Sequence, residues 1–219
     1  MSLELVGANT VVAAHQFNPS IVTQLWLVKI GLLTEDEFKP GCVFTDMVAH
    51  VNAKDFQLIV VDAQCQFTPH KDHVEDQELV SSKVGSIVHA LPETPYRAIG
   101  LNFLWHLIPE DGDVPTVSRD LFFFPGGPLY REFDDESARF GAYMSKDVLG
   151  VRLKLDVKPI TLEKDQQQEE RIQFAFNFHL DVASKKDPVA HIEEMLSRWN
   201  AAREAASHIV HTALRKELA

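Results

Sequence analysis

Cysteine is scarce in this sequence, because the chain of 219 residues contains only Cys42 and Cys65. Two cysteines imply no disulfide framework. Long apolar runs are also missing, and no uninterrupted apolar segment is long enough to cross a bilayer. The N-terminus, Met-Ser-Leu-Glu-Leu, lacks the basic region and the apolar stretch of a secretory signal peptide. We therefore expect a cytoplasmic protein with no membrane partner.

Motifs for catalysis and for cofactor binding are absent as well. The sequence has no Gly-x-Gly-x-x-Gly pattern, no P-loop, no zinc knuckle and no His-Glu-x-x-His. Ser145 and Lys146 are adjacent, but consecutive residues on a strand point to opposite faces, which argues against a Ser-Lys dyad. The sequence thus predicts no cofactor, and it favours a protein without catalytic activity over an enzyme.

Basic residues are fewer than acidic ones. The chain has 21 Lys and Arg residues and 32 Asp and Glu residues, which gives a formal net charge of -11. An acidic surface repels phosphate groups, and no cluster of Lys and Arg offsets it locally. Binding to nucleic acid or to anionic membranes is therefore not expected. The remaining composition, 45% hydrophobic and 24% charged, is that of an ordinary globular protein.

The residues from Pro95 to Ile108 form the clearest pattern in the chain. The odd positions are hydrophobic, namely Ile99, Leu101, Phe103, Trp105 and Leu107. The even positions include the small residues Ala98 and Gly100 and the polar residues Asn102 and His106. Alternation with a period of two predicts a strand that has one face in the core and the other face in a different environment.

The first half of the chain, residues 1–110, is predicted to have the element order β-α-β-β-α-β. The predicted elements are a strand within Leu3–Phe17, a helix from Asn18-Pro19 to about Ile30, a hairpin of Cys42–Val51 and Phe56–Phe67, a helix over Gln77–Leu91 and the strand that ends at Ile108. A buried strand is the competing interpretation for Ile21–Leu33. This order is that of a split β-α-β, or ferredoxin-like, unit.

The turn-rich segment Pro109–Pro115 separates this half from residues 116–219. Strands are predicted at Asp120–Phe124, Ala138–Ser145, Gly150–Ile160 and Arg171–Val182, followed by one long helix from Asp187-Pro188 to about Leu218. We expect an α+β fold of two fused halves, the second a mostly antiparallel sheet with a long C-terminal helix. A single continuous domain is the alternative. Asn102-Phe103 and Asn177-Phe178 occupy similar strands, which indicates either a duplication or two ordinary core strands.

The non-hydrophobic face of the two best strands is the first candidate surface for a ligand or partner. Its residues are Asn102, His106, Gln173, Asn177 and His179. Small neighbours in a strand often mark the close approach of a ligand, another backbone or a helix. Two simpler interpretations stay open, namely that the long helix covers this face or that the face is merely solvated.

The last helix carries a second, weaker candidate. Glu204, His208 and His211 have the spacing i, i+4 and i+7, so they lie along one stripe of the helix. Carboxylate and imidazole groups bind divalent metals, but a further ligand from elsewhere in the chain would be required. A polar helix face without metal is the simpler interpretation.

The sequence therefore favours a binding or assembly protein that contacts another protein, or a second copy of itself as a homodimer, through the sheet face. The length of the last helix would help it to reach a second subunit. Strands followed by a long helix are similar in order to bacterial SecB-like chaperones, which bind other polypeptides; this similarity transfers no residues. The alternative is a metal-dependent or small-molecule-binding enzyme that uses histidines of the sheet face or the last helix.

Overall fold

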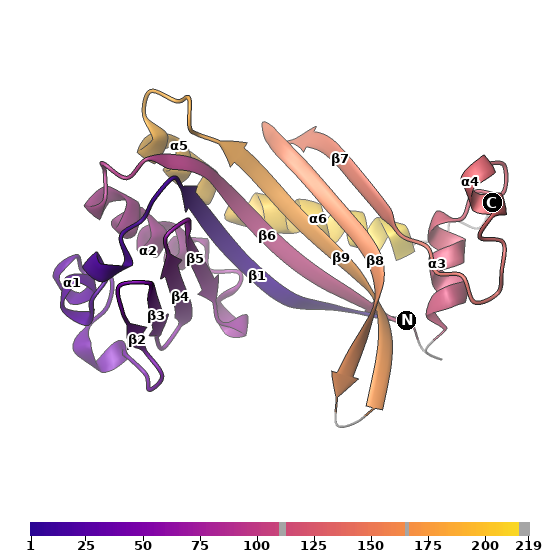
Figure 1. Ribbon diagram of the computed structural model, residues 1–219, viewed down its shortest axis with the longest axis horizontal. Coiled ribbons are helices and arrows are strands. Elements are labelled where there is room, and N and C mark those ends of the chain that lie inside the picture. Colours follow the sequence, from indigo (N-terminus) through magenta and orange to yellow (C-terminus); the bar gives the residue numbers. More distant parts are fainter. Residues whose placement is uncertain (110–112, 165–166, 215–219) are drawn as a thin grey trace.

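The computed structural model describes residues 1–109, 113–164 and 167–214 (Figure 1). Nine strands of these residues form one antiparallel sheet in the order β2-β3-β4-β5-β1-β6-β9-β8-β7. An α+β fold with a mostly antiparallel sheet and C-terminal helices is thus confirmed. The strands are β1 (Ser2–Ala14), β2 (Val43–Phe44), β3 (Val48–Asn52), β4 (Phe56–Val61), β5 (Gln64–Pro69), β6 (Tyr96–Ile108), β7 (Ala142–Val148), β8 (Val151–Lys164) and β9 (Gln167–Asp181).

The helices are short compared with the long central strands. They are η1 (Pro19–Ile21), α1 (Gln24–Lys29), η2 (Glu35–Glu37), η3 (Lys71–His73), α2 (Gln77–Ala90), α3 (Val114–Phe122), α4 (Pro128–Arg131), α5 (Pro188–Leu196) and α6 (Trp199–Leu214). None of the described helices has the length and apolar character that a membrane span requires. In Figure 1, α6 passes behind the strands β6, β9 and β8, and α3 and α4 lie beyond one end of the sheet.

The alternating residues of β6 place its hydrophobic side chains on one face of the sheet, as predicted. Ile99, Leu101 and Leu107 are buried on one face, and the same face of the neighbouring β9 carries buried Phe174 and Phe178. The helices α5 and α6 pack on this aromatic face. The ring of the fully buried Trp199 in α6 lies 4.9 Å from the ring of Phe103 in β6. The hydrophobic core therefore lies between the helices and the aromatic face of the sheet.

The first half of the chain has more strands than predicted. The two predicted hairpin strands are four, because Val61 pairs with Gln64 across a two-residue turn and the chain also reverses between β2 and β3. Between β1 and β6 the order of helices and strands is therefore α-β-β-β-β-α instead of the predicted α-β-β-α. The ferredoxin-like unit is not confirmed.

The predicted helix after Asn18 is present in two pieces. The Asn18 side chain accepts a hydrogen bond from the Ser20 N–H and caps η1, as the Asn-Pro sequence indicates. A second cap, the Thr23 hydroxyl, then begins α1. The amphipathic helix predicted from Gln77 is confirmed as α2, and the Asp76 side chain caps it.

The strand predicted at Asp120–Phe124 is wrong, because these residues end the helix α3 and enter the loop after it. The Asp113 carboxylate caps α3 by accepting from the Thr116 N–H at 3.0 Å. Apolar residues at helical spacing, Val117 and Leu121 among them, pack against the core. Of the predicted boundary Pro109–Pro115, residues 110–112 lie outside the described residues.

The remaining strands of the second half match their predictions in position but not in every boundary. β7 begins four residues later than predicted, at Ala142. β8 and β9 extend into the segment 161–170 that separates the two predicted strands, of which residues 165–166 lie outside the described residues.

The single long helix predicted from Asp187 is two helices, α5 and α6. At the break the Ser197 hydroxyl donates to the Glu194 carbonyl, and the Arg198 N–H donates to the Met195 carbonyl, so the regular hydrogen-bond ladder is interrupted. Arg198 also donates to the Leu149 carbonyl at 2.6 Å in the turn between β7 and β8. Residues 215–218 of the predicted helix lie outside the described residues.

The two edges of the sheet are unequal. β2 is an edge of two residues, whereas β7 at the opposite edge has seven. The sheet runs without interruption across both predicted halves, because β1 of the first half lies beside β6, and β6 lies beside β9 of the second half.

Candidate functional site

The face of the sheet opposite the helices is the open face, defined here by the polar and small residues of β1, β6, β9 and β8 that point away from the aromatic face. Figure 1 shows its central strands uncovered on the near side. Asn102 and His106 on β6 and Gln173, Asn177 and His179 on β9 all lie on it. The predicted surface is thus one surface, and the C-terminal helices leave it free.

Three asparagines form a hydrogen-bonded ladder across the middle of the open face. Asn102 is paired in register with Asn9 on one side and with Asn177 on the other. The Asn177 Nδ2 donates to Asn102 Oδ1 at 2.7 Å, and the Asn102 Nδ2 donates to Asn9 Oδ1 at 2.8 Å. Both hydrogen bonds run in the same direction, from β9 through β6 to β1, so they polarise one another.

Gly100 makes room for this ladder. A Cβ atom at Gly100 would lie 2.8 Å from the Asn177 Nδ2, closer than real Cβ contacts allow. The absence of a side chain at Gly100, in the neighbouring row, leaves space for the Asn177 amide as it reaches Asn102 opposite it. The small residue that the sequence placed beside the polar positions is therefore a spacer for a side chain of the same sheet.

A hollow of about 410 Å³ lies over the ladder. Gly7, Leu104 and Ala175 lie in one register row of the sheet and form part of its lining. Tyr143 and Asp156 continue that row on β7 and β8. The volume falls within the range of about 300–1,000 Å³ that is typical of ligand sites.

Sequence patterns did not identify Asn9, Tyr143, Lys154 and Asp156 as part of this surface. Lys154 is paired in register with Asn177, so its side chain continues the line of the ladder onto β8. The sequence contains one hint of Asn9, which is a polar residue among the small and β-branched residues of β1. This hint can be interpreted only when β1 is known to lie beside β6.

His106 lies in a charged cluster at the other end of the open face and is only 6% exposed. The Arg171 guanidinium faces the His106 Nδ1 at 3.5 Å and forms ion pairs with Glu169 at 2.9 Å and Glu4 at 3.5 Å. Burial, and secondly the neighbouring Arg171 guanidinium, lower the pKa of His106. An arginine can only donate, so this contact requires a neutral His106 with its proton on Nε2.

The lowered pKa of His106 predicts a stability that depends on pH. The unfolded chain binds a proton at His106 more readily than the folded chain does, so this contribution is complete above about pH 6.5 and is lost as the pH falls below it. Denaturant unfolding at pH 7.5 and pH 5 measures the difference. His106→Gln is expected to reduce the pH dependence of the free energy of unfolding. His15→Gln, at an exposed loop position, is the matched control for the substitution itself.

The second histidine of the open face is far from the first. His179 is paired in register with Gly100, and His106 with Gln173, so the two histidines are six residues apart along the strands. At about 3.4 Å per residue this is a separation of about 20 Å. Burial, and secondly Lys154, lower the pKa of His179. The two imidazoles therefore cannot act on the same atom of a ligand.

The metal candidate on the last helix lies on an exposed stripe of α6. Glu204, His208 and His211 are exposed, and the His211 Nδ1 lies 2.8 Å from the Ser207 carbonyl oxygen. The His211 ring also packs edge-on against Trp105. No group of three or more His, Cys, Asp or Glu side chains suited to a metal ion occurs in the described part of the chain.

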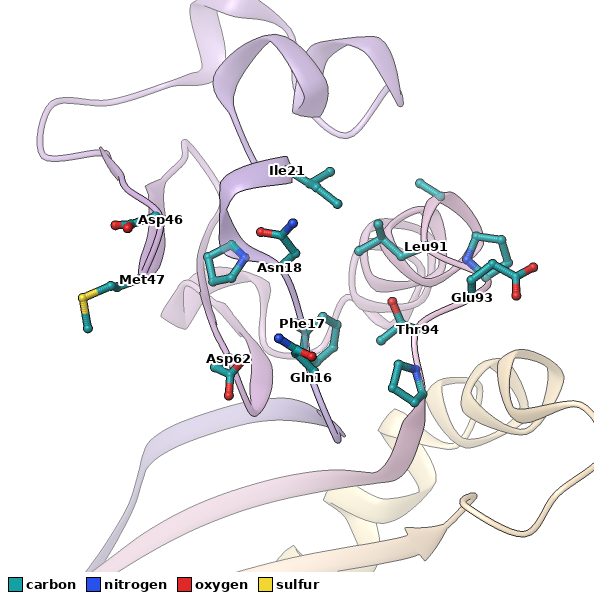
Figure 2. Close-up of a pocket in the computed structure, with 14 residues that line it drawn as sticks. Gln16, Phe17, Asn18, Ile21, Asp46, Met47, Asp62, Leu91, Glu93 and Thr94 are labelled. Carbon is teal, nitrogen blue, oxygen red and sulfur yellow. The ribbon is translucent and has the colours of Figure 1, made fainter.

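A cavity larger than the hollow over the ladder lies elsewhere, at the end of the sheet where β1 ends and β6 begins (Figure 2). It has a volume of about 830 Å³, and none of the sequence-predicted site residues lines it. Residues from four separate loops meet there, which no local sequence pattern could indicate.

The open face therefore combines amide groups, a hollow and mixed charges on one surface, and a separate cleft lies at the end of the sheet. No protein-family model matches the chain, and no curated protein matches it either.

Proposed function

We propose that the protein is a cytoplasmic binding protein, without catalytic activity, whose open face takes an extended segment of a polypeptide. The partner is another protein or a second copy of this chain. The observation that carries the proposal is the asparagine ladder Asn9–Asn102–Asn177, which crosses the floor of an uncovered hollow.

The ladder has unused hydrogen-bonding groups at both ends. Among the described residues, neither the Asn9 Nδ2 nor the Asn177 Oδ1 has a hydrogen-bond partner. One end therefore offers a donor and the other an acceptor. A peptide group carries one N–H and one C=O, so an extended segment that crosses the ladder can satisfy both ends.

The row beside the ladder supports binding of side chains. Ala175 and Gly7 leave space in the hollow, Leu104 supplies an apolar surface, and Tyr143 is exposed at its side. Tyrosine buries a large apolar area and retains a hydroxyl for hydrogen bonding, and for this reason it is frequent at protein interfaces. Main-chain hydrogen bonds would supply affinity, and the hollow would supply selectivity for a side chain.

The test fills the hollow and leaves the ladder intact. A panel of short fluorescent peptides of zero net charge is screened by anisotropy, and the tightest peptide is then measured with variants. Ala175→Trp is expected to weaken binding by at least about tenfold, because the indole occupies the space that the ligand needs. Gln57→Trp, at an exposed position of β4 outside the hollow, is the matched control and should change the affinity by less than about twofold.

Thermal unfolding of both variants verifies that they are folded. Chemical shift changes of the Asn9 and Asn177 side-chain amides on titration with the same peptide give a second, independent measurement. The proposal is wrong if no neutral peptide binds, or if the Ala175→Trp and Gln57→Trp variants bind the peptide equally well. It is also wrong if the chemical shift changes occur at residues of the aromatic face, which the helices cover.

A further inference from the structure

The cleft at the end of the sheet is separate from the open face and has its own chemistry. Figure 2 shows its lining residues arranged around an open space. They come from the segment after β1, the turn between β2 and β3, the turn between β4 and β5, and the end of α2 with the loop into β6. At about 830 Å³ the cleft is large enough for several side chains of a ligand.

The charged residues of the cleft are all acidic. Asp46, Asp62 and Glu93 each come from a different turn or loop, and all three are exposed. None of the described residues that line the cleft is Lys, Arg or His. The last turn of α2 also opens into it through Ala90 and Leu91, and the C-terminal end of a helix carries partial negative charge. The cleft therefore attracts positive charge.

The same cleft has an apolar floor and an apolar rim. Phe17 and Pro19 are buried, and Leu91 is partly buried beside them. At the rim the residue Met47 is 77% exposed and Ile21 is 41% exposed. Figure 2 shows Met47 beside Asp46 on one side of Phe17, and Leu91 near Thr94 on the other side. Exposed methionine is common on surfaces that bind varied partners, because its side chain adapts its shape.

We infer that this cleft binds a polypeptide segment in which Lys or Arg residues flank apolar residues. The acidic rim pairs with the basic groups, and the floor of Phe17, Pro19 and Leu91 receives the apolar side chains. A bare metal ion fits less well, because the three carboxylates are distributed over separate loops and no suitable metal cluster occurs in the described part of the chain. The formal net charge of -11 adds a long-range attraction for such a segment.

The test uses a short peptide with two lysines around a Pro-Leu pair, and a second peptide in which glutamate replaces each lysine. The triple variant Asp46→Asn, Asp62→Asn and Glu93→Gln removes the carboxylates of the cleft. The matched triple Asp72→Asn, Glu132→Gln and Glu136→Gln removes three exposed carboxylates elsewhere, so both variants change the net charge equally. Calorimetric or anisotropy titrations at two salt concentrations give the affinities.

We expect the lysine peptide to bind the wild-type protein and the matched triple with affinities within about threefold of each other, and the cleft triple at least about tenfold more weakly. The affinity for the wild-type protein should fall with added salt, because exposed charges are screened. Ala175→Trp should leave this binding unchanged, which separates the cleft from the open face. The inference is wrong if the lysine peptide does not bind, if the glutamate peptide binds as well, if the two triples behave alike, or if Ala175→Trp abolishes binding.

Discussion

Replacing Trp199 by alanine is expected to lower the free energy of unfolding by about 3–5 kcal/mol. The Trp199 side chain is fully buried, its ring lies 4.9 Å from that of Phe103, and its Nε1 donates to the Val74 carbonyl at 2.7 Å. The substitution leaves a large cavity between α6 and β6 and also removes the partner of a buried carbonyl. Denaturant unfolding followed by circular dichroism measures the loss.

Trp199→Phe is the control for this prediction. Phenylalanine keeps most of the ring packing against Phe103 but cannot donate to the Val74 carbonyl, so a smaller loss of about 1–3 kcal/mol is expected. Equal losses for the two variants would show that the hydrogen bond, and not the packing of α6 on β6, carries the stability.

Asn102→Ala is expected to lower the free energy of unfolding by about 2 kcal/mol, because it removes both hydrogen bonds of the ladder at about 1 kcal/mol each. Asn9→Ala removes one of the two bonds and should cost about half as much. Unfolding of the two single variants and of the double variant gives the coupling between the side chains directly.

The double variant decides whether the ladder forms in solution. With Asn102 already replaced, the further change Asn9→Ala should cost almost nothing, because its partner is gone. Additive losses, or a loss for Asn102→Ala no larger than that for Asn9→Ala, would contradict the ladder.

The elements with strong local periodicity could be predicted from the sequence. β6 and β9 alternate hydrophobic and other residues over most of their length, and α2 has both helical spacing and an Asp76 cap. These signals are local, so they do not depend on how the strands and helices pack together. The aromatic face of β6 and β9 was for the same reason identified as the core face.

The turns that split the first hairpin could not be predicted, because tertiary contacts hold one of them. The turn at Asp62 and Ala63 has no glycine, proline or asparagine. Its carbonyl groups instead accept from the backbone of the chain after β1: the Ala14 N–H donates to Ala63 at 3.1 Å, and the Phe17 N–H donates to Asp62 at 2.6 Å. Such partners are not visible in a local window of sequence.

The misassigned strand at Asp120–Phe124 has a different cause. Three consecutive phenylalanines resemble a buried strand, but Leu121 and Phe122 contact the core from a helix that begins at the Asp113 cap. A short apolar run fits either structure, and the capping signal upstream was the better evidence.

Two of the three asparagines of the candidate site were predicted from the sequence, but their arrangement as one ladder was not. The sequence placed Asn102 and Asn177 on non-core faces of two strands, and the structure joins them in register. The third member, Asn9, required knowledge that β1 inserts between β5 and β6. Strand order depends on long-range pairing, which is why the ladder emerged only from the structure.

The unequal edges of the sheet limit how this chain can polymerise. Fibres built by strand addition need two usable edges, so that each added chain offers a new one. Here β7 presents seven residues of backbone to a neighbour, whereas β2 at the far edge presents two. Strand addition at β7 between two copies uses the long edge of both. A pair joined in this way has no second β7 edge, so further addition of the same kind stops there.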